Sequence, residues 1–352
     1  MKATTKKSIT LSDVAKTAGV TSMTVSRVVN KNGYVSEETR EKVLQVIKEL
    51  NYRRNGLARG LKRQRTDTLG LVLGDIANPY AAELARSIRD ITAQRGYNLF
   101  ICISEHSAKE DVAAFDSLAD HQVDGIIVAT RSNRIGDNHL HEMIDRGVSV
   151  VCIGRDFHDE NSDSVTADAL NGGFQATQHL IDLGHKRIAF IGATIASGEN
   201  LKRLQGYLKA LEENGLEIDE RLITGNTEAN EDAPGYSTEK LGYEAMKRLL
   251  VLPNRPTAVF ARNDFTAVGA INAIKENGLS IPNDISIVGF DDIPMAIHTS
   301  PTLTTVRQPT RRQGSLAAEF LLRRIEAKES VKREEIVLEC ELIVRDSTSS
   351  PN

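Results

Sequence analysis

The sequence predicts a small all-α head containing a helix-turn-helix, followed by an α/β body of two doubly wound parallel-sheet lobes. Three observations predict this fold class. The first 50 residues hold three short helical patterns, and the region beyond Thr68 alternates short apolar runs with amphipathic stretches. A basic segment with two glycines lies between them. At 352 residues the chain exceeds one ordinary domain, so two or three folding units are expected.

Start and stop signals place three helices in the head. Thr10 followed by Asp13 is typical of an N-cap with an acidic residue in the first turn, and Gly19 ends that helix. A second helix is expected after Thr21 and a third from Ser36, where glutamates suit the positive helix end. The apolar positions expected to pack together are Leu11, Val14, Ala15, Ala18, Val25, Val28, Val29, Val43, Val46, Ile47 and Leu50.

Residues 19–30, GVTSMTVSRVVN, have the features of a recognition helix. A turn with glycine precedes small polar residues at the helix start, where a major groove can be entered, and valines occupy the opposite face. The plainer alternative is a generic three-helix surface domain, because Ser and Thr at a helix start are ordinary caps.

The charge distribution bears on that choice. Residues 1–65 contain 15 Lys and Arg against 5 Asp and Glu, whereas the remainder contains 29 against 43. A basic head on an acidic body favours a polyanion such as nucleic acid as the partner of the head. A charged run can equally be a solvated face, so the helix pattern and the charge are needed together.

The β-α alternation of the body argues for parallel sheets covered by helices on both faces, and so many units fit two lobes better than one sheet. The apolar runs are residues 69–73, 99–103, 125–128, 148–153, 188–191, 258–261 and 285–290. The helical candidates between them are residues 80–95, 140–146, 171–183, 201–214 and 264–277.

Several function classes are disfavoured by what the sequence lacks. It has no run of about 20 apolar residues, and MKATTKK lacks the apolar stretch of a signal peptide, so a cytoplasmic location is expected. Cys102, Cys152 and Cys340 lack metal-ligand spacing and are expected to be buried small hydrophobes. No GxxxxGK[ST], HExxH or GxSxG motif occurs, so we expect no enzyme, no cofactor and no metal.

The strings TLSDVAKTAGVTSMTVSRVVN, VSEETREKV and ELNYRRNGLARGL resemble the head and hinge of the LacI/GalR repressor family, and the similarity continues to about Asp346. The resemblance implies a transcriptional repressor with a periplasmic-binding-protein-like body and a ligand cleft between two lobes. It implies a DNA-binding domain at 1–54, a hinge at 55–67 and an effector-binding and dimerisation domain at 68–352. Within the body, an N-lobe is expected at about 68–165 plus 300–327, and a C-lobe at about 166–299 plus 328–346.

By this resemblance, Ser22, Met23 and Arg27 meet base edges. Arg27 can make a bidentate contact to guanine, whereas Met23 offers only apolar contact to a thymine methyl. The positions implied to grip phosphates, which set register rather than sequence, are Thr10, Thr21, Thr24, Ser26, Asn30 and Tyr34.

In the hinge, the resemblance assigns Asn55, Ala58 and Leu61 to DNA, with Leu61 as an apolar wedge in the minor groove. Gly56 and Gly60 each disfavour a helix by roughly 1 kcal/mol relative to alanine. We therefore expect a helix that orders only on DNA, which would couple the head to the body. The alternative is a flexible linker with incidental leucines.

Ligand-binding residues are sought beyond the carboxyl ends of parallel strands. The resemblance places Arg203, Asn263 and Asp291 in the cleft, where a planar cation, an amide and a carboxylate suit hydroxyl groups. Tyr80 can pack its ring against a sugar or a base; its alternative role is to cap the following helix.

Three further positions complete the predicted ligand set. Arg155 follows Gly154, where the family often has aspartate, and is expected to replace that contact. Ser197 and Tyr236 are expected to line the cleft.

The expected ligand is a sugar or sugar derivative, because the polar cleft set suits hydroxyls. The alternatives are a regulator that responds to a purine or nucleoside corepressor, and a sugar-processing enzyme. The expected assembly is a homodimer on double-stranded operator DNA, since the final DSTSSPN contains no leucine heptad that would build a tetramer helix.

Overall fold

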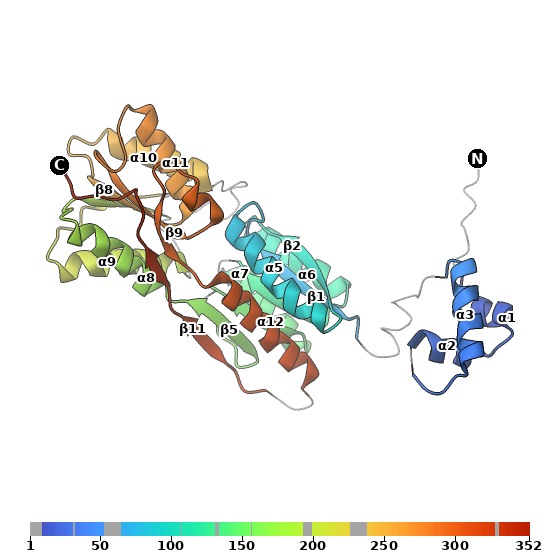
Figure 1. The fold of residues 1–352 in the computed structure, drawn as a ribbon. Helices are drawn as coiled ribbons and strands as arrows, with labels where there is room; N and C mark the ends of the chain where they lie inside the picture. The colour runs from blue at the N-terminus through green and yellow to red at the C-terminus, as the bar shows by residue number, and fades with distance from the viewer. Residues whose placement is uncertain are drawn as a thin grey trace, which may run out of the picture. The chain divides into compact units, whose positions relative to one another are not determined.

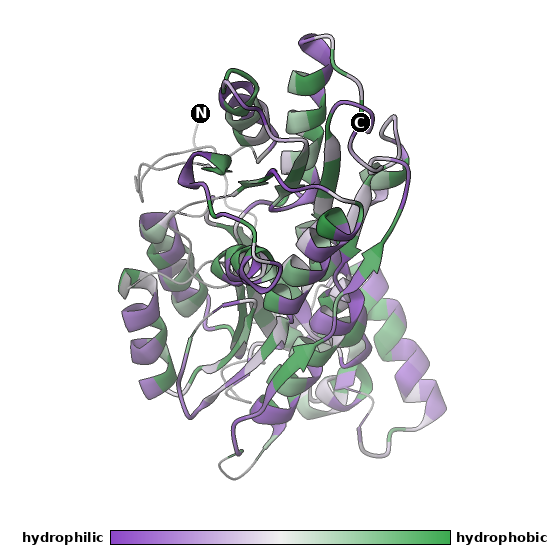
Figure 2. Ribbon diagram, turned by 90° about the vertical axis from the view of Figure 1, so that its left-hand side faces the viewer, coloured by the Kyte–Doolittle hydropathy of each residue, from purple (hydrophilic) through white to green (hydrophobic). Residues whose placement is uncertain are grey.

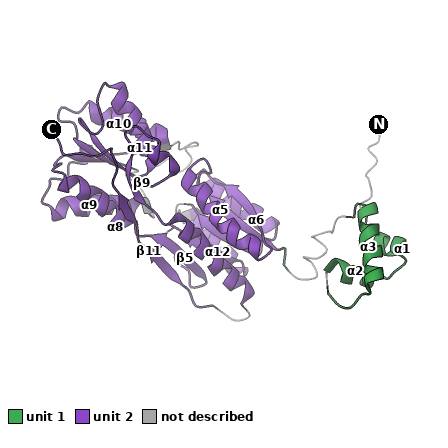
Figure 3. Cartoon of the chain, in the orientation of Figure 1, with its two compact units in different colours: residues 1–66 green, residues 67–352 purple. Residues whose placement is uncertain are grey.

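The computed structural model describes residues 9–30, 32–52, 65–105, 107–130, 134–155, 157–192, 199–225, 238–327 and 331–352. The chain divides into two compact units, Met1–Thr66 and Asp67–Asn352, coloured separately in Figure 3. Five predicted site residues lie outside the described residues, namely Asn55, Ala58, Leu61, Ser197 and Tyr236.

The head consists of the three predicted helices, α1 (Leu11–Ala18), α2 (Ser22–Asn30) and α3 (Glu37–Glu49). A capping box starts α1: the Thr10 hydroxyl accepts the Asp13 N–H, and the Asp13 carboxylate accepts the Thr10 N–H at 2.8 Å. Gly19 ends α1 in the left-handed conformation with φ 64°. The buried core of the head contains Val14, Ala15, Ala18, Val25, Val28, Val43 and Val46.

The body contains two six-stranded sheets with the same strand order (Figure 1). The first has the order β11-β5-β4-β3-β1-β2 and the second β12-β10-β9-β8-β6-β7. All described pairings are parallel except that of β12 with β10. The strands of the first sheet are β1 (Thr68–Leu73), β2 (Asn98–Ile103), β3 (Gly125–Ala129), β4 (Ser149–Ile153), β5 (Ser162–Ala167) and β11 (Glu335–Leu338). Those of the second are β6 (Ile188–Ile191), β7 (Ile223–Thr224), β8 (Ala258–Ala261), β9 (Ser286–Asp291), β10 (Thr304–Arg307) and β12 (Glu341–Ile343).

Helices cover both faces of each sheet, which confirms the predicted doubly wound class. The first sheet carries α5 (Pro79–Gln94), α6 (Ala108–Asp120), α7 (Arg134–Asp145) and α12 (Thr310–Glu326). The second carries α8 (Ala169–Asp182), α9 (Glu199–Glu213), α10 (Thr238–Leu250) and α11 (Asp264–Glu276). Two 3₁₀ turns, η1 (Glu220–Leu222) and η2 (Pro294–Ile297), complete the elements. Within the described residues, no helix combines the length and apolarity needed to cross a membrane.

The period-two alternation of the strands explains the two faces. Along β4, Val151 packs with α5 and α12, whereas its neighbours Val150 and Cys152 pack with α6 and α7. In β8, Phe260 faces α8 and α9 while Val259 faces α10 and α11. Figure 2 shows the result as hydrophobic strands enclosed by helices of mixed hydropathy.

The cysteines follow the same packing. Cys152 and Cys340 are buried as expected, and burial raises the pKa of the Cys152 thiol to about 12. Cys102 is only half-buried, contrary to the expectation, because β2 is the edge strand of its sheet. All three thiols are free.

The strand pairing corrects the expected lobe boundaries in two places. β10 pairs with β9 in the second sheet, so residues 304–307 belong to the C-lobe and the chain crosses to the N-lobe only after Arg307. β11 pairs with β5 in the first sheet, so the chain returns to the C-lobe after Leu338. The other crossing lies at Asp168, between β5 and α8, and its N–H donates to the Leu338 carbonyl at 2.7 Å. Backbone pairing, which the apolar pattern does not reveal, decides these boundaries.

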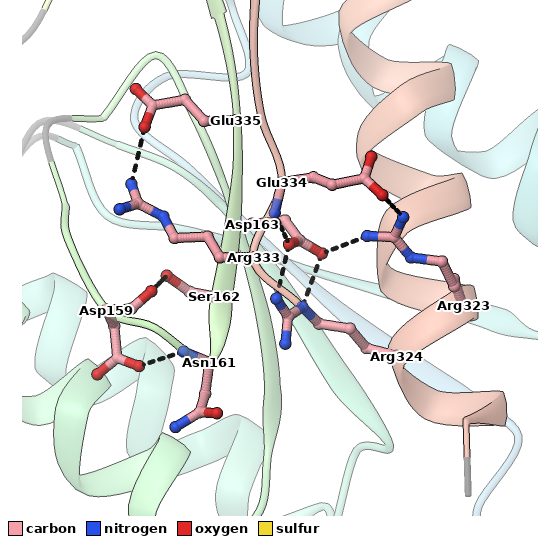
Figure 4. Close-up of polar contacts among 9 residues, drawn as sticks. All are labelled: Asp159, Asn161, Ser162, Asp163, Arg323, Arg324, Arg333, Glu334 and Glu335. Carbon is pink, nitrogen blue, oxygen red and sulfur yellow. Dashed lines mark hydrogen bonds and ion pairs between the residues drawn. The ribbon is translucent and has the colours of Figure 1, made fainter. Parts of the chain in front are cut away.

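A buried carboxylate fastens the last helix of the N-lobe to the returning chain (Figure 4). The Asp163 side chain, in β5, is fully buried and accepts two hydrogen bonds from Arg324, each 2.6 Å long. It also accepts the Glu334 N–H at 2.7 Å and one bond from Arg323 at 3.2 Å. Arg323 in turn pairs with the Glu334 carboxylate. One carboxylate thus holds β5, α12 and the segment entering β11 together.

Replacing Asp163 by asparagine should leave the Arg324 guanidinium without its buried counter-charge. We expect a loss of about 3–5 kcal/mol in the free energy of unfolding, because removal of one partner strands a buried charge. Urea unfolding followed by circular dichroism measures the change. The control is Asp90→Asn, which breaks an exposed pair with Arg89 and should leave the unfolding midpoint unchanged. Equal midpoints for Asp163→Asn and the wild type would contradict the buried-clamp interpretation.

Candidate functional site

One face of the helix α2 is exposed to solvent. Met23 is 66% exposed, and Ser22 and Arg27 are exposed beside it. Val25 and Val28, on the opposite face, are buried against the rest of the head. The three residues predicted to meet base edges therefore share a solvent-facing surface on a rigid helix, which is the geometry that a groove-reading helix requires.

Gly33 leaves room for the Arg27 side chain. A Cβ built on Gly33 would lie 3.3 Å from Cδ of Arg27, and the φ of Gly33 is +74°. Both the left-handed backbone and the close approach favour glycine here. The turn after α2 therefore defines one side of the space available to the arginine.

The residues predicted to grip phosphates lie at exposed or half-buried positions of the same unit. Two pairs among them are bonded locally: the Thr21 and Thr24 hydroxyls are 2.9 Å apart, and the Asn30 side-chain amide donates to Ser26 at 2.9 Å. Tyr34 is 89% exposed. These side chains are preorganised on the surface of the head, as phosphate contacts that set register would need.

In the body, three predicted ligand residues follow strands of the second sheet, and two of them, Arg203 and Asp291, lie against each other. Asp291 ends β9, Asn263 follows β8, and Arg203 lies on α9, after β6. Nη2 of Arg203 is 3.7 Å from Oδ1 of Asp291, and its Nη1 donates to the Arg262 carbonyl at 2.6 Å. β6 and β8 are the neighbours at which this sheet's strand order reverses, where open parallel sheets bind ligands.

The Arg203 guanidinium also packs against an aromatic ring. Its Cζ lies 3.9 Å from the centre of the Phe290 ring, so the cation stacks on an aromatic face. The side chain is 6% exposed. A stacked, largely desolvated arginine next to a carboxylate presents a fixed array of donors and acceptors, which can orient a polar ligand.

Asp264 is a second carboxyl residue near Asp291. It is fully buried, accepts the Ile293 N–H at 2.8 Å and accepts the Thr305 hydroxyl at 2.5 Å. Burial, together with the nearby Asp291 charge, raises the Asp264 pKa well above its usual value. A Cβ on Gly289 would lie 2.2 Å from Asp264 Oδ1, so glycine is needed for this packing.

Asn263 has a structural role besides its predicted one. Its side-chain carbonyl accepts the Thr266 N–H at 2.9 Å and so caps α11. This bond holds the side-chain carbonyl oxygen of Asn263 against the first turn of α11. The remaining hydrogen-bonding group of the amide, its NH₂, is the part that can act as a donor to a ligand.

Tyr80 lies in the first turn of α5, after the N-cap Asn78. Asn78, rather than Tyr80, makes the capping bond, since the Tyr80 N–H donates to the Asn78 side chain at 3.0 Å. The Tyr80 hydroxyl donates to Gln313 Oε1 at 3.4 Å, and its ring is half-buried against the N-lobe core. The alternative that Tyr80 merely caps the helix is therefore wrong.

Arg155 is committed to the interior of the N-lobe. Its side chain is 0% exposed and donates to Asp137 at 2.6 Å and to the Thr130 hydroxyl at 2.7 Å. Asp111 lies 3.9 Å away. These contacts join α6, α7 and the loops after β3 and β4, so the Arg155 side chain holds these N-lobe elements together.

Sequence reasoning missed Gln308, which is 4% exposed and donates to Asp291 at 2.6 Å. It directly follows β10, so the rule applied to other strand ends would have found it. The short run TTVR was not recognised as a strand, because a hydrophobic pattern of four residues is ambiguous.

Comparison with protein families gives two matches. Residues 10–55 match the model of bacterial regulatory proteins of the lacI family. Residues 177–348 match the periplasmic binding protein-like domain. The first segment coincides with the head. The second covers most of the C-lobe, together with the N-lobe elements α12 and β11, and it does not reach back to Asp168.

Similar proteins extend the match to the whole chain. The HTH-type transcriptional repressor PurR of Histophilus somni is 37% identical over 97% of this chain and 99% of its own length. A solved complex of the transcriptional regulator CelR with cellobiose is 35% identical, covers 96% of this chain and 99% of its own, and has a TM-score of 0.70. The lac repressor dimer bound to operator and the anti-inducer ONPF is 28% identical, covers 97% and 100%, and has a TM-score of 0.81.

Asn263→Ala removes the cap of α11. We expect the free energy of unfolding to fall by about 1 kcal/mol, because the Thr266 N–H then lacks its acceptor. Urea unfolding measures the loss. Asn263→Ser is the matched control, since a serine hydroxyl can still accept that bond and should restore most of the stability. A serine variant as unstable as the alanine variant would contradict the capping role.

Proposed function

This chain belongs to the LacI family of bacterial regulatory proteins, a family of DNA-binding transcription regulators, and we propose that it is a ligand-controlled repressor acting as a homodimer. In this proposal each head reads half of a near-palindromic operator, and a small polar ligand in the body controls operator affinity. The arrangement of Arg203, Asn263 and Asp291 at the strand-order reversal is the observation that carries the ligand part. The exposed face of α2 carries the DNA part.

Two heads must enter major grooves about one helical turn, roughly 34 Å, apart, so an assembly of two chains is required. The similar lac repressor structure is itself of a dimer. The edge strand β2 is consistent with contact to a second protein chain, because its apolar residues Phe100, Ile101 and Ile103 are 39%, 43% and 37% exposed. Exposed apolar side chains on an edge strand are a hazard unless another chain covers them.

Ser22, Met23 and Arg27 are the proposed base-reading residues, and the other polar residues of the head set register. The proposed hinge at 55–67, with Asn55, Ala58 and Leu61 in contact with DNA, orders only on bent duplex and so transmits the state of the body. Coupling of about 1–3 kcal/mol is enough to change operator affinity 5- to 150-fold.

The proposed ligand is a sugar or sugar derivative. Arg203, Asp291 and the Asn263 amide offer donors and acceptors at fixed positions, which suit neighbouring hydroxyls. The similar CelR structure holds cellobiose, which fits this choice. We propose no catalytic step, since the similar full-length proteins are transcriptional regulators, and we propose that the protein acts in the cytoplasm, where the DNA lies.

Loss of the Arg27 side chain should weaken operator binding and relax its sequence preference. Duplexes selected from a random pool by the wild-type protein supply the operator, and Arg27→Ala should lower affinity for them by about 1–3 kcal/mol. Affinity for unrelated duplex should change far less. Arg40→Ala, which removes the same charge from α3, is the control and should not alter sequence preference. Unchanged preference in Arg27→Ala would contradict a base-reading role.

Thermal denaturation with cellobiose, D-ribose, sugar phosphates and purine bases tests the ligand proposal. A compound at 100 times its Kd should stabilise the folded state by about 2.7 kcal/mol. Asp291→Ala and Arg203→Ala should each abolish that shift, whereas Asp116→Ala, which removes an exposed carboxylate on α6, should keep it. A shift that survives in both site variants would refute the proposed pocket, and a shift with purines alone would replace the sugar by a purine ligand.

A further inference from the structure

We propose that Gln308 is a positioning residue of the ligand site, which ties the Asp291 carboxylate to the crossing between the lobes. Through it, occupancy of the site by a ligand is passed to α12 and the N-lobe. The inference rests on the ligand role of Asp291 proposed above. It adds the residue by which that site communicates.

The crossing itself is only two residues long. β10 ends at Arg307 in the second sheet, and α12 begins at Thr310 against the first, which leaves Gln308 and Pro309 between them. The Gln308 carbonyl accepts the Thr310 N–H at 2.9 Å, and the Pro309 carbonyl accepts the Gln313 N–H at 2.9 Å. Proline fixes its own φ, so the crossing has little slack. A displacement of residue 308 therefore moves the start of α12 with it.

The contact with Asp291 is short and buried. Nε2 of Gln308 donates to Oδ1 of Asp291 at 2.6 Å, and the two residues are 4% and 7% exposed. Because the acceptor is a carboxylate, the amide nitrogen rather than the amide oxygen must face it. The Asp291 oxygen so engaged is also the one that lies 3.7 Å from Arg203, in the proposed ligand cluster.

The turn that carries Asp291 is held in an uncommon conformation. Asp291 and Asp292 have φ values of 110° and 55°, which non-glycine residues seldom adopt. Side-chain contacts to the crossing help to hold both residues: Gln308 donates to Asp291, and Arg307 donates to Asp292 at 2.8 Å. The last residue of β10 and the first residue of the crossing thus each donate to one of the two consecutive residues of the strained turn.

The amide of Gln308 is only half satisfied. Within the described residues its Oε1 is buried and has no hydrogen-bond partner, although its Nε2 is bonded. Gln313, on the first turn of α12, shows the complementary pattern among the same residues: its Nε2 is buried with no partner, while its Oε1 accepts from Tyr80. Buried groups left unpaired destabilise the arrangement that contains them.

A ligand hydroxyl or N–H that donates to Asp291 withdraws charge from the same carboxylate and so weakens its hydrogen bond with the Gln308 amide. Release of that amide removes one tie between the strained turn and the crossing, and the short crossing passes the change to α12. Occupied and empty sites therefore favour different positions of the two lobes, which is the differential interaction that allosteric control requires.

Hydrogen–deuterium exchange on the full chain tests the tie without ligand or DNA. Gln308→Met keeps the size of the side chain but cannot donate, and it should raise amide exchange at least fivefold both in residues 291–293 and at the start of α12. Gln178→Met is the matched control, because it removes an exposed glutamine–aspartate bond of 2.7 Å to Asp182 in the C-lobe. Exchange in Gln308→Met equal to the wild type at either segment overturns the proposal.

A general loosening of the body is distinguished by a double-variant comparison. If the amide acts through Asp291, then Gln308→Met should add nothing to the exchange of the crossing in an Asp291→Asn background. An additive effect means that Gln308 is merely a packing residue, which overturns the proposal. These outcomes do not depend on DNA or ligand binding, so their failure is separate from failure of the proposed function.

The last experiment measures how strongly the bound compound changes the affinity of the protein for operator DNA. With cellobiose as the probe, or whichever compound of the panel raises the melting temperature, Gln308→Met and the wild type are compared at concentrations that saturate each protein. The ratio of operator affinities with and without it should fall at least fivefold toward one. An unchanged ratio would overturn the relay.

Discussion

The chain passes between the two sheets of the body at three crossings, each one or two residues long. Buried hydrogen bonds lie at or beside these crossings. The crossings lie at Asp168, at Gln308–Pro309 and at Glu339–Cys340. The first and third are bonded to each other through the Asp168 N–H and the Leu338 carbonyl. Because such short connections have few internal degrees of freedom, the side chains beside them determine how one lobe can lie against the other.

Buried charge is arranged differently on the two sides of these crossings. In the N-lobe, Asp163 is paired with arginines at 2.6 Å, so its charge is compensated and the contact is mainly structural. In the C-lobe, burial raises the pKa of Asp264, and the nearby Asp291 charge adds to that shift. Asp291 itself lies 3.7 Å from Arg203, so the buried carboxyls of the two lobes differ in how closely arginine approaches them.

In the head, the exposed residues of interest lie on one helix, α2, which packs on a small hydrophobic core. Val25 and Val28 orient α2, so that Ser22, Met23 and Arg27 emerge together on the outside. An arginine side chain can make a bidentate contact to guanine, whereas a methionine such as Met23 offers only apolar contact. The head supplies recognition and the body supplies the ligand response, and their combination in one chain is what a regulated repressor needs.

The sequence by itself determined the helices of the head and the fold class, and its resemblance to a repressor family pointed to Arg203, Asn263 and Asp291, with further candidates on the N-lobe side. Local signals carry that information: the Thr10–Asp13 cap, Gly19, the period of the valines, and polar residues directly after apolar runs. Only the tertiary structure decided that β10 and β11 exchange lobes relative to expectation, that Arg155 belongs to the N-lobe interior, and that Gln308 meets Asp291. It also placed Ser347, from the polar DSTSSPN segment, in a fully buried position. Strand pairing and side-chain contact join residues far apart in the chain, and no local pattern of hydropathy encodes which distant partner a short strand or a buried polar group will find.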